Sequence, residues 1–285
     1  MGGGIRDQVG DGSMKIDVLI STKDRPVELA MLLNSLDFQT HDRFDVVIID
    51  GSAGDQRNNQ YVIRAIQQLE RNGHEVLFER IDIPGVLATR QKAQELSNKE
   101  WVLRVDDDVI LHPKYIENLI MTHFKDDDPE TLGIVSGITP MWGVPMYYRA
   151  AEKVHADGII NKLEIEDGKI MKFGDDCGFD YDLFENPILN AGHFRSCALH
   201  RRNLWDYTDF PLSLVGFREE TMASLIARWK GYRIKVNLKA KAWHFQSSEG
   251  GCRYPNYADI VKSDDNAFQV WVSRKVKQYG GNPKC

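Results

Sequence analysis

Three adjacent carboxylates follow a short apolar segment, and this arrangement is the one in the chain that most directly suggests chemistry. Trp101–Val105 has the composition and length of a buried strand, and Asp106, Asp107 and Asp108 come directly after it. Like charges clustered at a strand end are costly unless a positive group neutralises them. Divalent cations often do so, since Mg²⁺ and Mn²⁺ prefer oxygen ligands and bridge to phosphate. We therefore expect Asp106 and Asp108 to hold a metal–diphosphate group; the alternative is a solvated acidic turn before a helix opening at Pro113.

Strand-like and helix-like segments alternate around this acidic run, from Lys15 to about Ser136. Apolar β-branched runs predict strands, at Ile16–Ser21, Phe44–Ile49, Glu75–Ile81, Trp101–Val105 and Gly133–Ile138. Amphipathic runs predict helices between them, at Pro26–Leu36, Arg57–Asn72, Val86–Ser97 and Pro113–Phe124. This alternation is typical of an α/β fold with a parallel sheet covered on both faces. Such sheets bind ligands at the carboxyl ends of their strands, where the acidic run would lie.

The pattern changes after Pro140. Met141–Tyr148 is an aromatic loop interrupted by glycine and proline, and Leu163–Met171 predicts a hairpin with Asp-Gly at its turn. A second amphipathic helix is expected from Arg218 to Lys230, followed by a strand at Tyr232–Val236. Apolar side chains at helical spacing predict the buried face of that helix: Met222, Leu225, Ile226 and Trp229. The last helix is expected at about 259–278.

Composition and charge argue against several classes of protein. The formal net charge of -6 over 285 residues argues against an extended basic surface for nucleic acid. No apolar run approaches the ~18 residues of a membrane span. Met1–Ser13 lacks the apolar core of a secretory signal, so we interpret it as a disordered leader or an expression remnant. The four cysteines show no paired metal spacing, which predicts free thiols and a cytoplasmic protein.

Six separated stretches resemble the GT-A glycosyltransferases, especially the inverting family-2 type. The stretches that carry the resemblance are Ile20–Pro26, Val46–Asp55, Gly85–Ala93, Val105–Asp108, Glu219–Ile234 and Lys241–His244. Each motif is loose alone, but six in the right order over most of the chain are fairly specific. The resemblance implies a GT-A fold, with a mixed, mostly parallel central sheet flanked by helices. It divides the domain 14–258 into a nucleotide-sugar-binding half, 14–139, and an acceptor-binding half, 140–258, with 259–285 as a C-terminal helix and tail.

The same resemblance implies roles for individual residues. Glu220 would be the base that takes a proton from the attacking hydroxyl, with Glu219 as the runner-up. Residues expected to contact the nucleotide sugar are Ser21, Thr22, Arg25, Asp50, Arg90, Asp106 and Asp107. The metal ligands would be Asp106, Asp108 and His244, and the imidazole nitrogen favours Mn²⁺ over Mg²⁺. Contacts to the donor sugar or acceptor would come from Trp142, Asn190, Gly192, His193 and Arg202.

The sequence also departs from the family pattern. Glu220 stands where the family usually has aspartate, and Gln91 where it has asparagine. Trp142–Phe184 has no counterpart that we can assign, so we expect it to carry acceptor specificity. The dipole of the helix favours the ionised form of Glu220, whereas the neighbouring carboxylate of Glu219 disfavours it. Arg104 lies inside an apolar strand and needs a carboxylate partner, either as a structural pair or beside the donor.

Two other functions remain open at this stage. A nucleotidylyltransferase would use a related sheet and metal, but such enzymes usually begin with a glycine-rich phosphate loop, and Ser21–Arg25 contains no glycine. A non-catalytic module that binds carbohydrate or nucleotide could keep the same fold. The partners expected are a nucleotide-sugar donor, most simply a UDP-sugar, and a saccharide or other hydroxyl acceptor. A protein, lipid or nucleic-acid acceptor is possible, and the basic candidates for nucleic acid are His200–Arg202 and the tail.

Overall fold

A single mixed sheet runs through the centre of the protein. The structure is a computed structural model that describes residues 14–82, 85–140, 159–166, 169–173, 186–245 and 247–283. Its first four neighbouring strands are parallel: β3 (Val76–Arg80), β2 (Phe44–Asp50), β1 (Ile16–Thr22) and β4 (Trp101–Asp106). The sheet continues with β11 (Ala198–Arg201), β6 (Leu132–Ile138), β12 (Arg233–His244), β10 (Ile188–Ala191) and β7 (Ile159–Ile160). A further strand, β5 (Val109–Leu111), pairs with β12, and β8 (Leu163–Glu166) pairs with β9 (Lys169–Phe173) as a separate hairpin.

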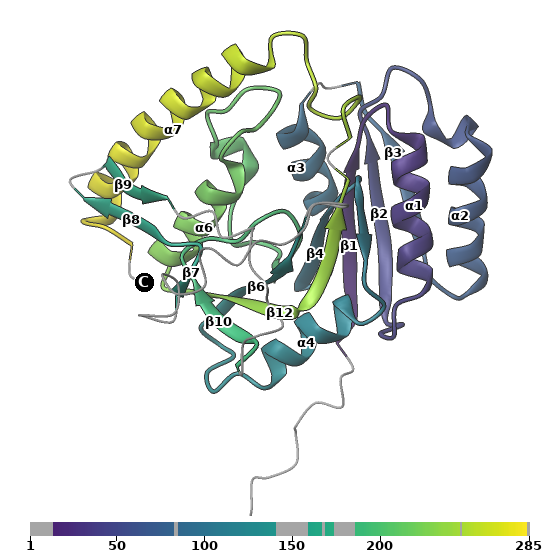
Figure 1. The fold of residues 1–285 in the computed structure, drawn as a ribbon, viewed down its shortest axis with the longest axis horizontal. Helices are drawn as coiled ribbons and strands as arrows, with labels where there is room; N and C mark the ends of the chain where they lie inside the picture. Colours follow the sequence, from purple (N-terminus) through teal and green to yellow (C-terminus); the bar gives the residue numbers. More distant parts are fainter. Residues whose placement is uncertain are drawn as a thin grey trace, which may run out of the picture.

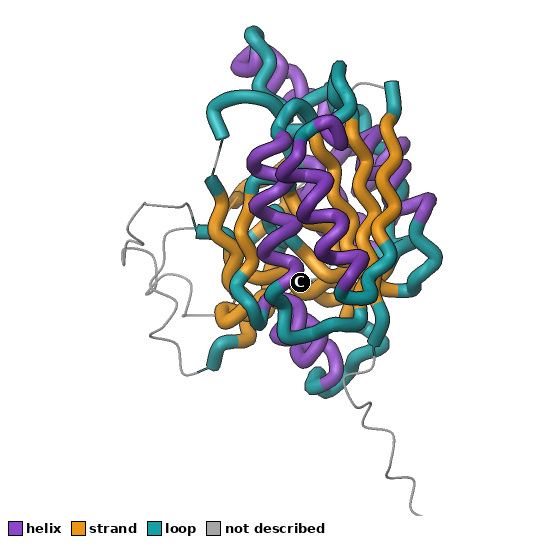
Figure 2. Tube along the Cα trace, turned by 90° about the vertical axis from the view of Figure 1, so that its right-hand side faces the viewer, coloured by secondary structure: helices purple, strands orange, loops and turns teal. Residues whose placement is uncertain are grey.

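Helices cover both faces of this sheet (Figure 1). One face packs against α1 (Pro26–Asp37), α2 (Gln60–Arg71) and α4 (Tyr115–Phe124). The other packs against α3 (Val86–Leu96), α6 (Glu219–Trp229) and α7 (Tyr257–Tyr279). Figure 2 looks onto the first layer, with its helices lying over the strands. The predicted α/β fold, with a mixed and mostly parallel sheet flanked by helices, is confirmed.

The alternation of side chains along each strand explains why the sheet needs helices on both sides. Successive residues of a strand point to opposite faces. In β1, Val18 and Ile20 belong to the core under α1 and α2, whereas Leu19 belongs to the core under α3. Because all three are apolar and at most 6% exposed, neither face of the strand can be left to water.

Several elements differ from the sequence-based expectation. The strand predicted at Tyr232–Val236 begins at Arg233 and continues to His244 as the twelve-residue strand β12. The helix expected from Arg57 begins only at Gln60, after a short 3₁₀ turn, because Asn59 caps it through a hydrogen bond from the Tyr61 amide. Strand β11 was not predicted; it lies antiparallel between β4 and β6. No helix within the described residues is both long enough and apolar enough to span a membrane.

Candidate active site

A cavity of about 390 Å³ opens at the carboxyl ends of β1 and β4. The register that pairs Ser21 with Asp106 brings the two strand ends together, at the edge of the sheet where the sequence places the site. Residues expected at the nucleotide sugar that line the cavity are Ser21, Thr22, Arg25, Arg90, Asp106 and Asp107. Residues expected at the metal, acceptor or catalytic step that line it are Asp108, His193, Glu219, Glu220 and His244.

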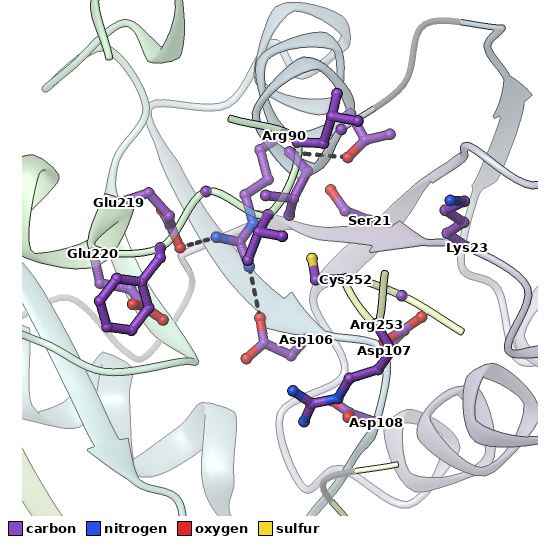
Figure 3. A pocket seen from close by; sticks show the side chains of 18 of the residues that line it. Ser21, Lys23, Arg90, Asp106, Asp107, Asp108, Glu219, Glu220, Cys252 and Arg253 are labelled. Atoms are coloured by element: carbon purple, nitrogen blue, oxygen red, sulfur yellow. Dashed lines mark hydrogen bonds and ion pairs between the residues drawn. The ribbon is translucent and has the colours of Figure 1, made fainter. Parts of the chain in front are cut away.

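Arginine side chains lie against the three aspartates at the tip of β4. Arg25 donates from one nitrogen to Asp107 Oδ1 and Asp108 Oδ2, both at 3.0 Å. Arg90 donates to Asp106 Oδ1 at 2.9 Å, and Figure 3 shows its guanidinium between Asp106 and Glu219. Guanidinium groups, including that of Arg104 at 3.6 Å from Asp106 Oδ1, therefore supply positive charge that the sequence argument expected from a metal ion.

The remaining oxygens of these aspartates also accept hydrogen bonds. The Ser196 hydroxyl donates to Asp106 Oδ2, and the Thr22 hydroxyl donates to Asp107 Oδ2 at 2.8 Å. Burial raises the pKa of Asp106, but Arg90 and Arg104 outweigh it and hold that pKa well below its usual range. Burial, with the charge of Asp108, raises the pKa of Asp107 to about 7 against the opposing effect of Arg25.

Arg25 should contribute strongly to stability, because its guanidinium is buried between two carboxylates and backbone carbonyls. The residue is 7% exposed, and it also donates to the carbonyls of Ser247 and Glu249. Arg25→Met would leave buried carboxylates without their partner, which typically costs ~3–5 kcal/mol of unfolding free energy. Urea unfolding measures this loss. The matched control is Arg57→Met, which breaks an exposed pair with Asp55 and should cost less than about 1 kcal/mol. Equal losses in both variants would contradict the assigned role of Arg25.

Asp108 and His244 form the part of the site that best fits a metal ion. Asp108 Oδ1 and His244 Nε2 lie 2.9 Å apart. Metal–ligand bonds of about 2.1 Å at right angles place two ligand atoms about 3 Å apart, so this spacing suits two ligands of one ion. The described residues contain no group of three His, Cys, Asp or Glu side chains arranged to hold a metal. Asp106 faces Arg90 and Ser196, so its place as a third ligand stays a prediction.

The charge of His244 depends on the same carboxylates. Burial lowers the pKa of His244, but the hydrogen bond to Asp108 and the charges of Asp108 and Asp106 outweigh it and raise that pKa above its ordinary value. The acidic strand tip therefore attracts a positive charge at this position. A proton on the imidazole and a metal ion beside it are alternative ways to supply that charge.

The buried guanidinium of Arg104 pairs with the two glutamates at the start of α6. Its side chain is 3% exposed and lies 2.6 Å from Glu219 Oε1 and 3.1 Å from Glu220 Oε1. Glu219 is also paired with Arg90. The first two residues of α6 are thus fixed to β4 and α3 by two guanidinium groups, and Arg104 is a structural partner of the acidic pair.

The surroundings of Glu220 keep its carboxylate ionised. Burial raises the pKa of Glu220, but Arg104, with Arg90 and Arg195, lowers it to a net value below the ordinary one. The opposing carboxylate is Asp106, rather than the neighbouring Glu219 that the sequence suggested. The Ser196 amide donates to Glu220 Oε1 at 3.2 Å. Glu220 therefore lines the cavity as an ionised acceptor, which is the form a general base requires.

Asp50 lies outside the cavity lining. Its side chain is fully buried and accepts hydrogen bonds from the Ser52 amide at 2.9 Å and from the Gln56 side chain at 2.9 Å. These bonds shape the turn after β2, the Asx-type role that Asp before Gly51 can also fill. Gln56 in turn donates to the Thr22 hydroxyl at 3.0 Å. Asp50 therefore supports the strand end next to the cavity through Gln56.

The residues expected at the acceptor are dispersed. Asn190 is exposed on β10, and Arg202 follows β11 at the amino end of β4, where it lines a separate cavity. A side chain at Gly192 would meet the backbone oxygen of Asn161 at 2.5 Å, so that glycine serves chain packing. Only His193 of this set lines the active-site cavity, and Trp142 lies outside the described residues.

Several residues in or beside the cavity gave no signal in the sequence: Arg218 lines the cavity, and Ser196 contacts Asp106 and Glu220 next to it. Ser196 and Arg218 adopt positive φ angles of 51° and 80°, which non-glycine residues rarely do and which often mark functional sites. The loop 214–218 and the segment 251–254 also line the cavity. No motif marks them, because they reach the site through contacts between distant parts of the chain.

Comparisons with known proteins agree with this architecture. The sequence profile described as "Glycosyl transferase family 2" matches residues 17–185, more than half of the chain. Among solved structures, S. aureus TarS 1-349 in complex with UDP-GlcNAc is 15% identical, with a TM-score of 0.55 over 93% of this chain and 73% of that one. S. aureus TarS 1-349 without a stated ligand is 16% identical, with a TM-score of 0.52 over 81% of this chain.

These likenesses have defined extents. The chain spans 60% of the length of that second TarS structure, and identities of 15–16% show the fold alone. The family profile ends before α6, so it does not include the acidic pair Glu219–Glu220. None of the curated proteins compared with the chain matches it. The profile match over more than half of the sequence nevertheless shows that the chain belongs to glycosyl transferase family 2.

Proposed function

We propose that this protein transfers a sugar from a nucleotide-sugar donor, most simply a UDP-sugar, to an acceptor hydroxyl with inversion at the anomeric carbon. The observation that carries the proposal is that one cavity is lined both by the acidic tip of β4 and by Glu219 and Glu220, of which Glu219 is buried and Glu220 is partly exposed. The acidic tip of β4, through a bound metal ion, can receive a charged diphosphate, and the carboxylate of Glu220 can receive a proton. The similar TarS structure was determined in complex with UDP-GlcNAc, which supports UDP as the nucleotide.

On the donor side, the chain offers cations and hydroxyls at the strand ends. Arg90 lies at the N-terminal part of α3, where its guanidinium can contact phosphoryl oxygens as well as Asp106. Asp108 and His244 would hold the divalent cation, with Mn²⁺ favoured over Mg²⁺ because one ligand is imidazole. When bound, that ion would act as a Lewis acid that offsets the charge building on the leaving diphosphate. Ser21 and Thr22 remain the candidates for contacts to the nucleoside.

On the acceptor side, Glu220 would accept the proton of the attacking hydroxyl. Glu220 lines the same cavity as the strand tip, and we expect a single displacement in which the hydroxyl attacks from the side opposite the leaving group. Arg104 and the Ser196 amide orient the carboxylate, so the base is held in place before the acceptor arrives. Inversion follows from one such displacement.

A screen of nucleotide sugars tests the proposal. Thermal shift with and without Mn²⁺ should find at least one UDP-sugar that stabilises the protein, and an assay for released UDP should then detect turnover with an acceptor. Stabilisation without any turnover across a broad acceptor set would favour a binding module. Formation of a nucleotide sugar from a nucleoside triphosphate and a sugar phosphate would favour a nucleotidylyltransferase.

Asp108→Ala should remove the metal-dependent part of the stabilisation by a UDP-sugar. The reason is that the substitution removes the carboxylate that would bind the metal ion together with the imidazole of His244. The measurement is the difference in Tm with and without Mn²⁺ at a fixed UDP-sugar concentration. Asp127→Ala, in a second run of three aspartates, is the matched control, because Asp127 is exposed and away from the cavity. A metal-dependent shift that survives in Asp108→Ala would contradict the metal site.

A further inference from the structure

The C-terminal helix α7 lies against the helix that carries the acidic pair. Its apolar side chains Phe268, Trp271 and Val272 are at most 4% exposed and pack in one core with Met222 and Leu225 of α6. Figure 1 shows α7 running along the same side of the sheet as α6. The sequence placed 259–285 outside the catalytic domain, whereas the packing makes α7 part of it.

One polar residue of α7 is buried among these contacts. Asp264 is 2% exposed, and its carboxylate accepts hydrogen bonds from two backbone amides of the loop before α6. The Ser213 amide donates to Oδ1 at 2.7 Å, and the Phe217 amide donates to Oδ2 at 2.9 Å. The Ser213 hydroxyl adds a bond to Oδ2 at 3.0 Å. The two ends of the loop 213–217 are thus fixed to one carboxylate.

The opposite side of this loop is held by the start of α3. The Val86 amide donates to the Leu214 carbonyl at 3.1 Å. Gly216 has a φ of +65°, and a side chain there would meet Val86 Cγ1 at 2.6 Å, so the loop and α3 are closely packed. The loop therefore lies between α3 and α7, with little room to shift unless one of them releases it.

The loop also leads directly into the acidic pair. Leu214, Val215, Gly216 and Phe217 line the active-site cavity. The Gly216 carbonyl accepts from the Glu219 amide at 3.1 Å, and Arg218 between them has a left-handed φ of 80°. A strained residue of this kind persists only when its surroundings fix it. A displacement of the loop would therefore pass to Glu219 and Glu220.

We propose that Asp264 is a positioning residue: from the C-terminal helix it fixes the loop 213–217 and thereby sets the placement of Glu220 in the cavity. This inference rests on the proposed function for its kinetic consequence, although its structural part does not. Misplacement of a catalytic group by about 1 Å can cost ~10²-fold in rate. Asp264 acts through the loop and does not itself line the cavity.

Asp264→Asn tests the proposal with little change in shape. An asparagine has one acceptor oxygen and an NH₂ group, so one of the two loop amides must face a donor instead of an acceptor. We expect kcat for sugar transfer to fall at least ~10-fold, while the Kd for UDP changes less than ~3-fold, because the expected nucleoside contacts Ser21 and Thr22 lie on β1. A fall in UDP affinity that matches the fall in kcat would overturn the positioning role.

The control lies on the same helix. Asp259→Asn removes an exposed carboxylate from the first turn of α7 and should leave both kcat and the Kd for UDP unchanged. Equal losses in the two variants would mean that charge on α7, and not the bonds to the loop, sets the activity.

Hydrogen exchange separates this inference from the proposed function. In Asp264→Asn, amides of residues 213–219 should exchange at least ~10-fold faster than in the wild-type protein, with no change in β1 or β2. This readout needs no substrate, so it remains informative if no nucleotide sugar is turned over. Unchanged exchange in 213–219 would refute the inference, even for an active glycosyltransferase.

Discussion

Glu220→Gln should strongly slow sugar transfer and leave nucleotide binding intact. The glutamine keeps the size of the side chain but cannot accept a proton from the acceptor hydroxyl at neutral pH. General-base catalysis typically contributes ~10²–10⁴-fold, so kcat should fall by about that factor. Both glutamates line the cavity, but the side chain of Glu220 is 32% exposed against 4% for Glu219, so Glu220 is the more accessible of the two to an acceptor.

The measurement is kcat for transfer together with the Kd for UDP in the same preparation. Glu219→Gln is the comparison, because it removes the runner-up carboxylate, which is enclosed by Arg90 and Arg104. We expect that variant to lose stability first, since it leaves two buried guanidinium groups short of a partner. If Glu220→Gln turned over normally and Glu219→Gln were folded but inactive, the base would be Glu219 and not Glu220.

Arg104→Gln should change how the rate depends on pH. Arg104 is the main group that holds the pKa of Glu220 below its ordinary value, against the effect of burial. Without that cation, burial is opposed by the smaller effects of Arg90 and Arg195, so the pKa of Glu220 should rise. In the wild-type enzyme Glu220 should add no acid limb to kcat between pH 5 and 8, whereas in the variant Glu220 should add one. At pH 7 its kcat should also fall ~10²-fold, because the carboxylate loses a partner that orients it.

The shift in the pKa of Glu220 also determines how this residue's contribution to the free energy of unfolding depends on pH. A carboxyl whose folded pKa is lowered contributes stability that is present above its unfolded pKa and lost as pH falls through the folded value. In Arg104→Gln the lowering of the Glu220 pKa becomes smaller, so the ionised Glu220 carboxyl should contribute less stability at neutral pH. Arg104→Lys, which keeps a charge, is the control and should show no new acid limb. A pH profile of Arg104→Gln that matches the wild type would contradict the assigned cause.

The first half of the fold could be predicted because its signals are local. Strands such as β1 and β2 contain continuous apolar runs, Val18–Ile20 and Val46–Ile49, and helices such as α1 start at recognisable residues such as Pro26. The acidic run at the end of β4 lies at the edge of the sheet where the cavity opens. The predicted buried face of α6 is also confirmed, because Met222 and Leu225 are fully buried.

The second half depends on pairings that no local pattern encodes. β11 has only four residues, and its insertion between β4 and β6 is set by partners about 60 to 100 positions away. The same holds for the charges: Arg25 meets Asp107 and Asp108 across more than 80 residues, so the sequence could not show that arginines neutralise the acidic run. The sequence also does not indicate the role of Asp264, because a buried hydrogen-bond acceptor on a helix has no sequence pattern that distinguishes it from an exposed polar residue.

The central claim is that the acidic tip of β4 receives the diphosphate of a nucleotide sugar. A crystal structure of the protein grown with UDP and Mn²⁺, with anomalous data that locate manganese, tests it most directly. We predict one manganese peak within bonding distance of Asp108 and His244, and the diphosphate between that ion and Arg90. Nucleotide bound elsewhere on the sheet, with these side chains still paired only to Arg25 and to each other, would contradict it.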